Sequence, residues 1–159
     1  MRHVISVTVE NKPGVLAHIS SLFAARGYSI DSLAVGETED PATSRMTIVT
    51  HGDDQIIEQI TKQLRKLIST LKVQDLGETE FIERDLVIVK VNAATGKRGE
   101  IIEIAQIFRG NIIDVGQKDL VVELSGQENK IQAFIDLLRP YGIKELARTG
   151  SIAMARGAK

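Results

Sequence analysis

The loop Asn11-Lys12-Pro13-Gly14 has the residue types and spacing best suited to bind a small molecule. It joins a segment rich in β-branched residues, typical of a strand, to a segment whose apolar residues recur at helical spacing. Its backbone N–H groups are therefore expected at a helix N-terminus. The amides of Gly14, Val15 and Leu16 would there attract a carboxylate. Gly14 has no Cβ and lets a ligand approach the backbone closely. Asn11 offers a donor and an acceptor, which suit the two charged groups of a free amino acid.

The same loop is also a good helix start without any ligand. Asn is a preferred capping residue, and Pro is favoured in the first helical turn. The alternative is therefore that Asn11 only caps the helix. If the loop does bind an amino acid, neighbouring apolar side chains would hold an aliphatic tail.

No catalytic constellation is found elsewhere in the sequence. The three histidines, His3, His18 and His51, match no metal-ligand spacing, and the carboxylates are scattered along polar segments. Gly96-Lys97 lacks the upstream glycine and the following Ser or Thr of a phosphate-binding loop. We therefore expect no catalytic residues and no metal site.

Composition narrows the classes of function further. The 159 residues carry a net charge of −1, and only 4% of them are aromatic, so neither nucleic acid nor an anionic membrane is an expected partner. The absence of Cys excludes disulfides and thiolate chemistry. No apolar run reaches the ~20 residues of a membrane helix, and the N-terminus does not resemble a signal peptide. These features are typical of a cytoplasmic protein.

The elements that position the loop follow one pattern that occurs twice. In the first half, alternating apolar residues predict strands at 4–10, 30–35, 45–50 and 72–76, and helical spacing predicts helices at 15–23 and 56–68. In the second half, strands are expected at 85–91, 111–115, 120–125 and 143–147, and helices at 101–108 and 131–138.

This order predicts an α+β protein of two tandem ferredoxin-like βαββαβ domains. We place the first domain at 1–77, a linker at 78–83 and the second domain at 84–159. The strand at 85–91 is apolar on both faces, so the sheet face that carries no helix has to be buried by other residues. We expect oligomerisation, sheet beside sheet or back to back, with cover by the other half of the chain as the alternative.

Longer strings of residues resemble a known family over essentially the whole chain. The strings are Glu10-Asn11-Lys12-Pro13-Gly14-Val15-Leu16, Arg26-Gly27-Tyr28-Ser29-Ile30-Asp31-Ser32-Leu33, Ser44-Arg45-Met46-Thr47-Ile48, Arg84-Asp85-Leu86-Val87-Ile88-Val89-Lys90-Val91, Ile107-Phe108-Arg109-Gly110 and Ala147-Arg148-Thr149-Gly150. In this order they resemble the ACT regulatory domain and, more narrowly, the small subunit of acetohydroxyacid synthase, also called acetolactate synthase.

The resemblance implies that the first domain is an ACT domain that binds its effector where two such domains pair. The effector would be contacted by Asn11, Pro13, Gly14, Val15 and Leu16 of one domain, and by Tyr28, Ser29 and Ile30 of the partner domain. The family often has Asn at the position of Ser29, and a hydroxyl carries one donor where an amide carries two. Which branched-chain amino acid binds best is therefore left open.

The resemblance also implies a non-catalytic regulatory subunit without a cofactor of its own. Such subunits pair with a large catalytic subunit, a transketolase-type transferase that uses thiamine diphosphate, Mg²⁺ and FAD. That enzyme condenses pyruvate with pyruvate or 2-oxobutyrate in valine, leucine and isoleucine synthesis. The small subunit raises its activity and confers feedback inhibition, usually by valine. We expect a homodimer through the ACT domains, with valine or a related branched-chain amino acid as effector.

Two other functions remain as alternatives: a stand-alone sensor, and a small ferredoxin-like enzyme or RNA binder. The enzyme would need a catalytic site, which the sequence does not show. A stand-alone ACT-domain sensor, regulating another enzyme or transcription, would share the loop but would not bind a thiamine enzyme. An RNA binder of this fold needs paired aromatic residues on its central strands, where this sequence has Val, Thr and Ile. The second half lacks an Asn-x-Pro-Gly loop at 92–96, so we expect it to serve dimerisation or contact with the catalytic subunit.

Overall fold

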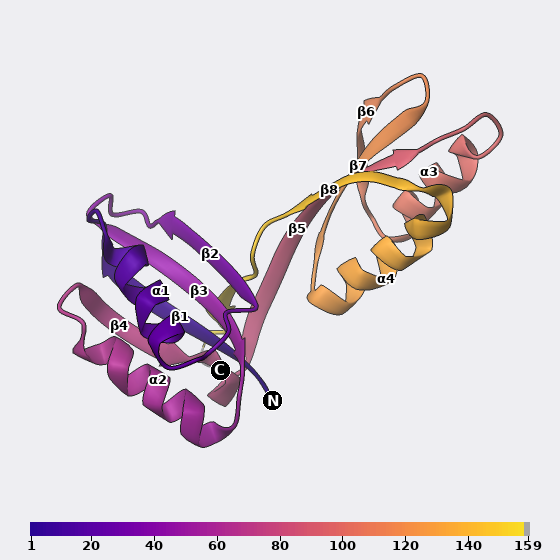
Figure 1. Ribbon diagram of the computed structural model, residues 1–159. Coiled ribbons are helices and arrows are strands. Elements are labelled where there is room, and N and C mark those ends of the chain that lie inside the picture. The colour runs from indigo at the N-terminus through magenta and orange to yellow at the C-terminus, as the bar shows by residue number, and fades with distance from the viewer. Residues whose placement is uncertain (158–159) are drawn as a thin grey trace. The chain divides into compact units, whose positions relative to one another are not determined.

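The computed structural model describes residues 1–157, in which the predicted order of elements occurs twice (Figure 1). The first set comprises β1 (Arg2–Glu10), α1 (Val15–Ala25), β2 (Ser32–Glu37), β3 (Thr43–His51), α2 (Asp54–Lys66), β4 (Thr70–Asp75) and the 3-10 turn η1 (Leu76–Glu78). The second comprises β5 (Phe81–Asn92), α3 (Arg98–Ile107), β6 (Asn111–Val115), β7 (Asp119–Gly126), α4 (Glu128–Leu138), the 3-10 turn η2 (Arg139–Tyr141) and β8 (Ile143–Arg148). A short strand, β9 (Ile152–Ala155), follows.

Both sheets have the strand order of a split βαβ fold. The first runs β2-β3-β1-β4 and the second β6-β7-β5-β8, and all neighbouring strands of the two paths are antiparallel. Each crossover helix connects two strands that do not neighbour each other, as this fold requires. The predicted α+β architecture of two ferredoxin-like domains is confirmed.

The core of the first unit lies between one face of its sheet and the two helices α1 and α2 (Figure 1). On β1, Ile5, Val7 and Val9 alternate with polar residues and are at most 1% exposed. The period of two therefore places all three against the helices. Ile19 and Phe23 of α1 and Ile60 and Leu64 of α2 complete this layer.

The second unit repeats the arrangement with its own core. Val87, Val89 and Val91 of β5 are fully buried under α3 and α4. The rings of Phe108 and Phe134 pack in a tilted pair with centroids 5.4 Å apart. The two cores are separate clusters, so each unit has its own hydrophobic stabilisation.

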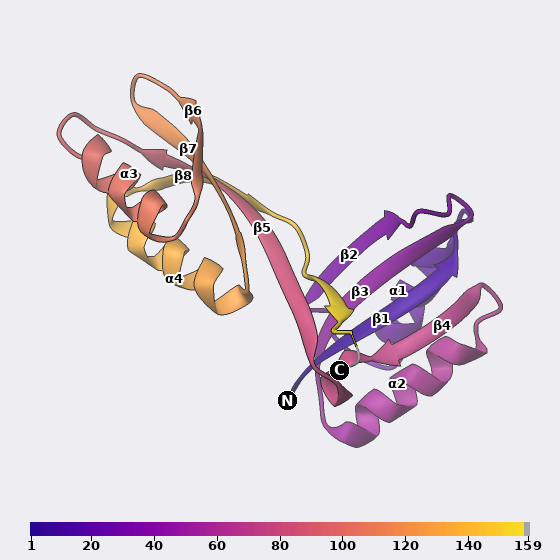
Figure 2. The same cartoon turned by 180° about the vertical axis from the view of Figure 1, so that it is seen from behind.

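The face of the first sheet that carries no helix is partly covered by the chain's own C-terminal segment (Figure 2). Val4 and Val49, on that face, are 2% exposed and cluster with Leu76 and with Ala153 of β9. The alternative of intramolecular cover is thus realised for this patch. The cover comes from the last strand of the chain, not from a whole second domain.

This packing changes the predicted domain boundaries. Residues 150–157 group with the first unit, which otherwise spans residues 1–83, and the second unit comprises 84–149. The predicted second domain at 84–159 therefore ends earlier, because β9 packs on the first sheet; residues 158 and 159 lie outside the described residues. The predicted linker at 78–83 is largely structured, since η1 ends at Glu78 and β5 begins at Phe81.

Gly150 lies directly against the backbone of β2. A Cβ atom at this position would overlap the carbonyl group of Leu33 and lie 3.0 Å from the nitrogen of Ala34. The next residue, Ser151, donates its backbone N–H to Ser32 Oγ at 2.8 Å, and Arg45 Nη2 donates to the carbonyl oxygen of Ala153 at 2.8 Å. Only glycine permits this approach, which attaches the C-terminal segment to the edge strand.

None of the helices within residues 1–157 combines the length and the apolar character that crossing a membrane requires.

We predict that Gly150→Ala destabilises the first unit, because the added methyl group has no space against Leu33. Overpacking of this kind costs about 1–3 kcal/mol, and it should be measured as a lower midpoint of urea unfolding. Gly157→Ala is the matched control, since a Cβ there meets no atom of the described residues within 4 Å. Equal midpoints for the two variants would show that the close approach at Gly150 is unimportant.

Candidate functional site

The turn from β1 into α1 depends on the backbone conformation of Gly14. Gly14 precedes the first helical residue with φ 85° and ψ −8°, in the left-handed region that residues with a side chain rarely adopt. A Cβ at this position would meet nothing within 4 Å. The glycine is therefore required by the chain conformation, and the space beside it is open to a ligand.

The N-terminus of α1 has no partner of its own for its partial positive charge. No side chain of residues 1–157 caps it, and its first turn contains no acidic residue. By contrast, Asp53 caps α2 by accepting from the N–H of Ile56 at 2.9 Å, and α3 and α4 begin with Glu100 and Glu128 in their first turns. Among the four α-helices of residues 1–157, α1 alone is left to attract an external anion.

Asn11 is bonded to the neighbouring hairpin and not to the helix. Its backbone N–H donates to the carbonyl oxygen of Ala42 at 2.8 Å. Its side-chain Nδ2 donates to Glu37 Oε1 at 3.1 Å and to the carbonyl oxygen of Pro41 at 3.0 Å. The alternative that Asn11 only caps α1 is therefore wrong. These bonds connect the loop to the β2–β3 hairpin.

The side chains of Val15 and Leu16 differ in burial. The side chain of Val15 points into the core and is 7% exposed, whereas Leu16 remains 42% exposed on the surface of α1. Val15 can thus contribute only its backbone N–H to a ligand, while Leu16 also presents an apolar side chain. Pro13 fixes the chain just before the left-handed turn.

Tyr28, Ser29 and Ile30 lie at the opposite end of α1. The 11 residues of this helix span about 16 Å. Tyr28 packs on the core and donates its hydroxyl to Gln59 Oε1 at 3.1 Å, and the carbonyl oxygen of Ser29 accepts from Thr50 Oγ1 at 2.7 Å. Within one chain, the structure does not bring these residues to the Gly14 loop. Their predicted contact with the effector requires a second chain.

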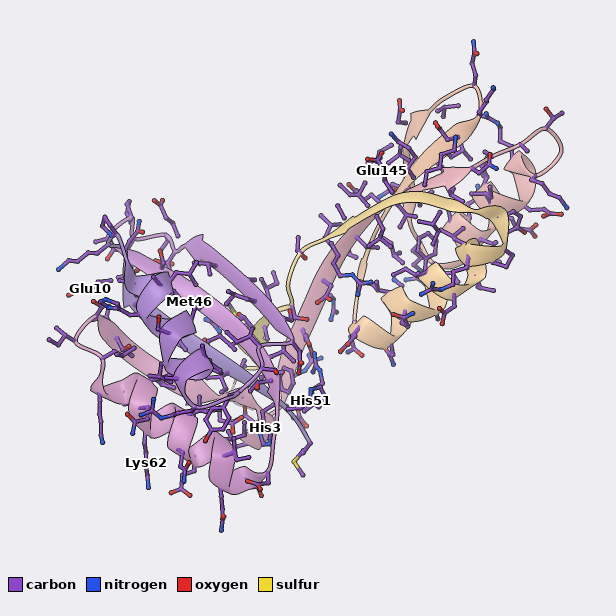
Figure 3. All side chains as sticks on the ribbon, viewed as in Figure 1. His3, Glu10, Met46, His51, Lys62 and Glu145 are labelled. Carbon is purple, nitrogen blue, oxygen red and sulfur yellow. The ribbon has the colours of Figure 1, made fainter. Side chains whose placement is uncertain are left out.

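A different hollow lies at the other end of the first sheet, far from Glu10, the residue that precedes Asn11 (Figure 3). This cavity of about 590 Å³ is lined by His3, Asp54 and Asp75 among others. His3 is 8% exposed; its Nδ1 lies 3.5 Å from Asp75 and its Nε2 lies 3.7 Å from Asp54. The cluster joins β1, α2 and β4, and Nε2 is shielded from solvent, so it is not exposed to an incoming ligand.

The second unit contains a structural counterpart of the Gly14 loop that the sequence motif did not reveal. Gly96 follows the end of β5 by the four residues that separate Gly14 from the end of β1, and its φ is 89°. Here, however, Glu100 occupies the first turn of the helix and accepts from the hydroxyl of Tyr141 at 2.8 Å. This hydrogen bond to a carboxylate raises the pKa of Tyr141. The helix end in the second unit already has its own anion.

Within the described part of the chain, no group of three metal-binding side chains comes together.

One residue of the candidate site, Glu37, was not predicted from the sequence; it lies 26 positions from Asn11. The predicted hairpin could have indicated this residue, because β3 pairs with both β1 and β2 and brings the end of β1 close to the end of β2.

Comparison with known protein families matches both halves of the chain. Residues 5–72 match a family model described as an AHAS small subunit-like ACT domain. Residues 84–157 match a second model, described as the small subunit of acetolactate synthase.

Individual relatives agree with the family models over most of their length. The chain is 55% identical over 159 residues to a probable acetolactate synthase small subunit of Archaeoglobus fulgidus, covering 100% of this chain and 99% of that protein. It is 46% identical over 160 residues to an acetolactate synthase small subunit of Bacillus subtilis, covering 100% and 93%. A crystal structure of the acetolactate synthase small subunit of Thermotoga maritima superposes with a TM-score of 0.92 at 42% identity, covering 100% and 99%.

Proposed function

The chain belongs to the family of acetolactate synthase small subunits, and on this premise we propose that it activates a separate catalytic subunit and makes it sensitive to valine. The effector would bind at the N-terminus of α1. The single observation that carries this assignment is the open, uncapped end of α1 beside Gly14. A carboxylate placed there would accept hydrogen bonds from the amides of Gly14, Val15 and Leu16 and meet the positive end of the helix dipole.

The proposal includes a homodimer through the first units. Tyr28, Ser29 and Ile30 lie a helix length away from Gly14 in the same chain. A two-fold arrangement of two first units would bring these residues of one chain toward the loop of the other, because a symmetric interface presents each patch to its counterpart. Leu16, which is half exposed, would then contact the aliphatic tail of the effector.

Regulation would follow from two arrangements of this dimer. Valine bound between two units would favour one arrangement, and the catalytic subunit would prefer the other. A coupling free energy of about 1–3 kcal/mol changes an affinity roughly 5- to 150-fold, which suffices for feedback control. Thiamine diphosphate, Mg²⁺ and FAD would belong to the catalytic subunit.

The second unit favours a subunit of an enzyme over a stand-alone sensor. A stand-alone sensor would need only the effector-binding domain, whereas residues 84–157 match a family model described as the small subunit of acetolactate synthase. Co-purification with the catalytic subunit separates the two functions.

Gly14→Asp should abolish valine inhibition and leave activation intact. The aspartate places a negative charge where the effector carboxylate would dock, and Asp tolerates the left-handed conformation better than most residues. The measurement is acetolactate synthase activity of the reconstituted complex over a range of valine concentrations. Gly14→Asn is the matched control, because it adds the same bulk without the charge and should weaken inhibition less. Inhibition of the Asp variant at the valine concentration that inhibits the unaltered complex would refute the site.

Branched-chain amino acids should stabilise the isolated chain against heat. A thermal shift panel of valine, leucine, isoleucine and lysine provides the measurement. A ligand present at about 100 times its dissociation constant adds about 2.7 kcal/mol to the free energy of unfolding. Lysine should have no effect, since its charged tail does not suit Leu16. A panel in which lysine stabilises as much as valine, or in which nothing stabilises, would contradict the proposed effector class.

A further inference from the structure

The side-chain amide of Asn11 has a defined orientation. Its nitrogen donates to Glu37 Oε1 at 3.1 Å and to the carbonyl oxygen of Pro41 at 3.0 Å. A carboxylate and a carbonyl group only accept hydrogen bonds, so the NH₂ group has to face them and both of its hydrogens are used. The amide oxygen, Oδ1, is turned the other way as an acceptor. Asn11 thus offers a ligand an acceptor and no donor, which corrects the expectation from the sequence that it offers both.

The charges near this amide divide into two poles. Glu37 ends β2, and Glu39 and Asp40 follow in the same hairpin loop. Lys12, the cation of the Gly14 loop, is paired with Glu10 at 3.0 Å. The first turn of α1 carries the partial positive charge of a helix N-terminus and no acidic side chain. A negative pole at Glu37 therefore accompanies a positive pole at Gly14.

We propose that Glu37 is a specificity-determining residue of the effector site and selects ligands with a protonated α-amino group. This inference rests on the proposed function, because it takes effector binding at the Gly14 loop as its starting point. Glu37 holds Asn11 so that Oδ1 accepts a hydrogen bond from the ammonium group. Its carboxylate also attracts the ammonium directly, while α1 binds the carboxylate of the same ligand.

The ligand that this arrangement rejects is the 2-oxo acid of the same carbon skeleton. That molecule has the same carboxylate and the same aliphatic tail, but a carbonyl oxygen replaces the ammonium group. The oxygen would face Asn11 Oδ1 and the Glu37 carboxylate, which are both acceptors, and no hydrogen bond would form. Amino transfer converts such an oxo acid into the amino acid. The site would therefore respond to the aminated product and not to its immediate precursor.

The test compares valine with 3-methyl-2-oxobutanoate, its 2-oxo analogue, by calorimetric titration of the 159-residue chain. The unaltered chain should bind valine more tightly. Glu37→Gln keeps an acceptor oxygen for Asn11 Nδ2 and removes the negative charge, so it should lower the ratio of the two affinities about tenfold, as expected for one hydrogen bond to a charged group. Glu39→Gln is the matched control, because it removes the same charge from the same loop without a bond to Asn11.

The outcomes separate this proposal from the proposed function. If the unaltered chain binds no branched-chain amino acid, the effector role fails and this inference fails with it. If the unaltered chain binds valine but Glu37→Gln keeps the affinity ratio within twofold, only the role of Glu37 is overturned. A ratio that falls equally in Glu39→Gln would also overturn it, because the effect would then reflect the net charge of the loop.

Discussion

The left-handed backbone at Gly14 is the constraint on which the candidate site depends. With φ at 85°, the chain leaves β1 and enters α1 without a side chain over the first amides of the helix. Asn11, which a helix start of this sequence would ordinarily use as a cap, is turned away toward Glu37 and Pro41. The helix end consequently keeps its unpaired donors and its partial positive charge, and both are available to an anion.

In the second unit, the same left-handed turn precedes a helix whose N-terminus is not available to an external anion. Gly96 repeats the left-handed turn, but Glu100 lies in the first turn of α3 and is hydrogen-bonded by Tyr141. An acidic residue in the first turn of the helix thus satisfies the dipole internally. The two halves of the chain share a fold, and their difference in one short loop is consistent with effector binding in the first half and another role in the second.

The sequence predicted the parts of the fold that depend on local pattern. The alternation of Ile5, Val7 and Val9 predicted the buried face of β1, and helical spacing predicted α1. It did not reveal β9, because this four-residue strand is defined by its pairing with β5 and by its packing on the first sheet, and both are tertiary contacts. Nor did it reveal the bond between Asn11 and Glu37, which depends on the register of two strands on either side of β3. Such contacts are set by tertiary structure and not by local spacing.

The proposed regulation requires that a small carboxylate binds to the first amides of α1. Backbone amide chemical shifts of the ¹⁵N-labelled chain, followed during a titration with valine, test it most directly. We expect the largest saturable shifts at Gly14, Val15 and Leu16, with smaller changes in the hairpin at Glu37. A titration in which these amides do not move, while valine perturbs residues elsewhere or none at all, would contradict the account.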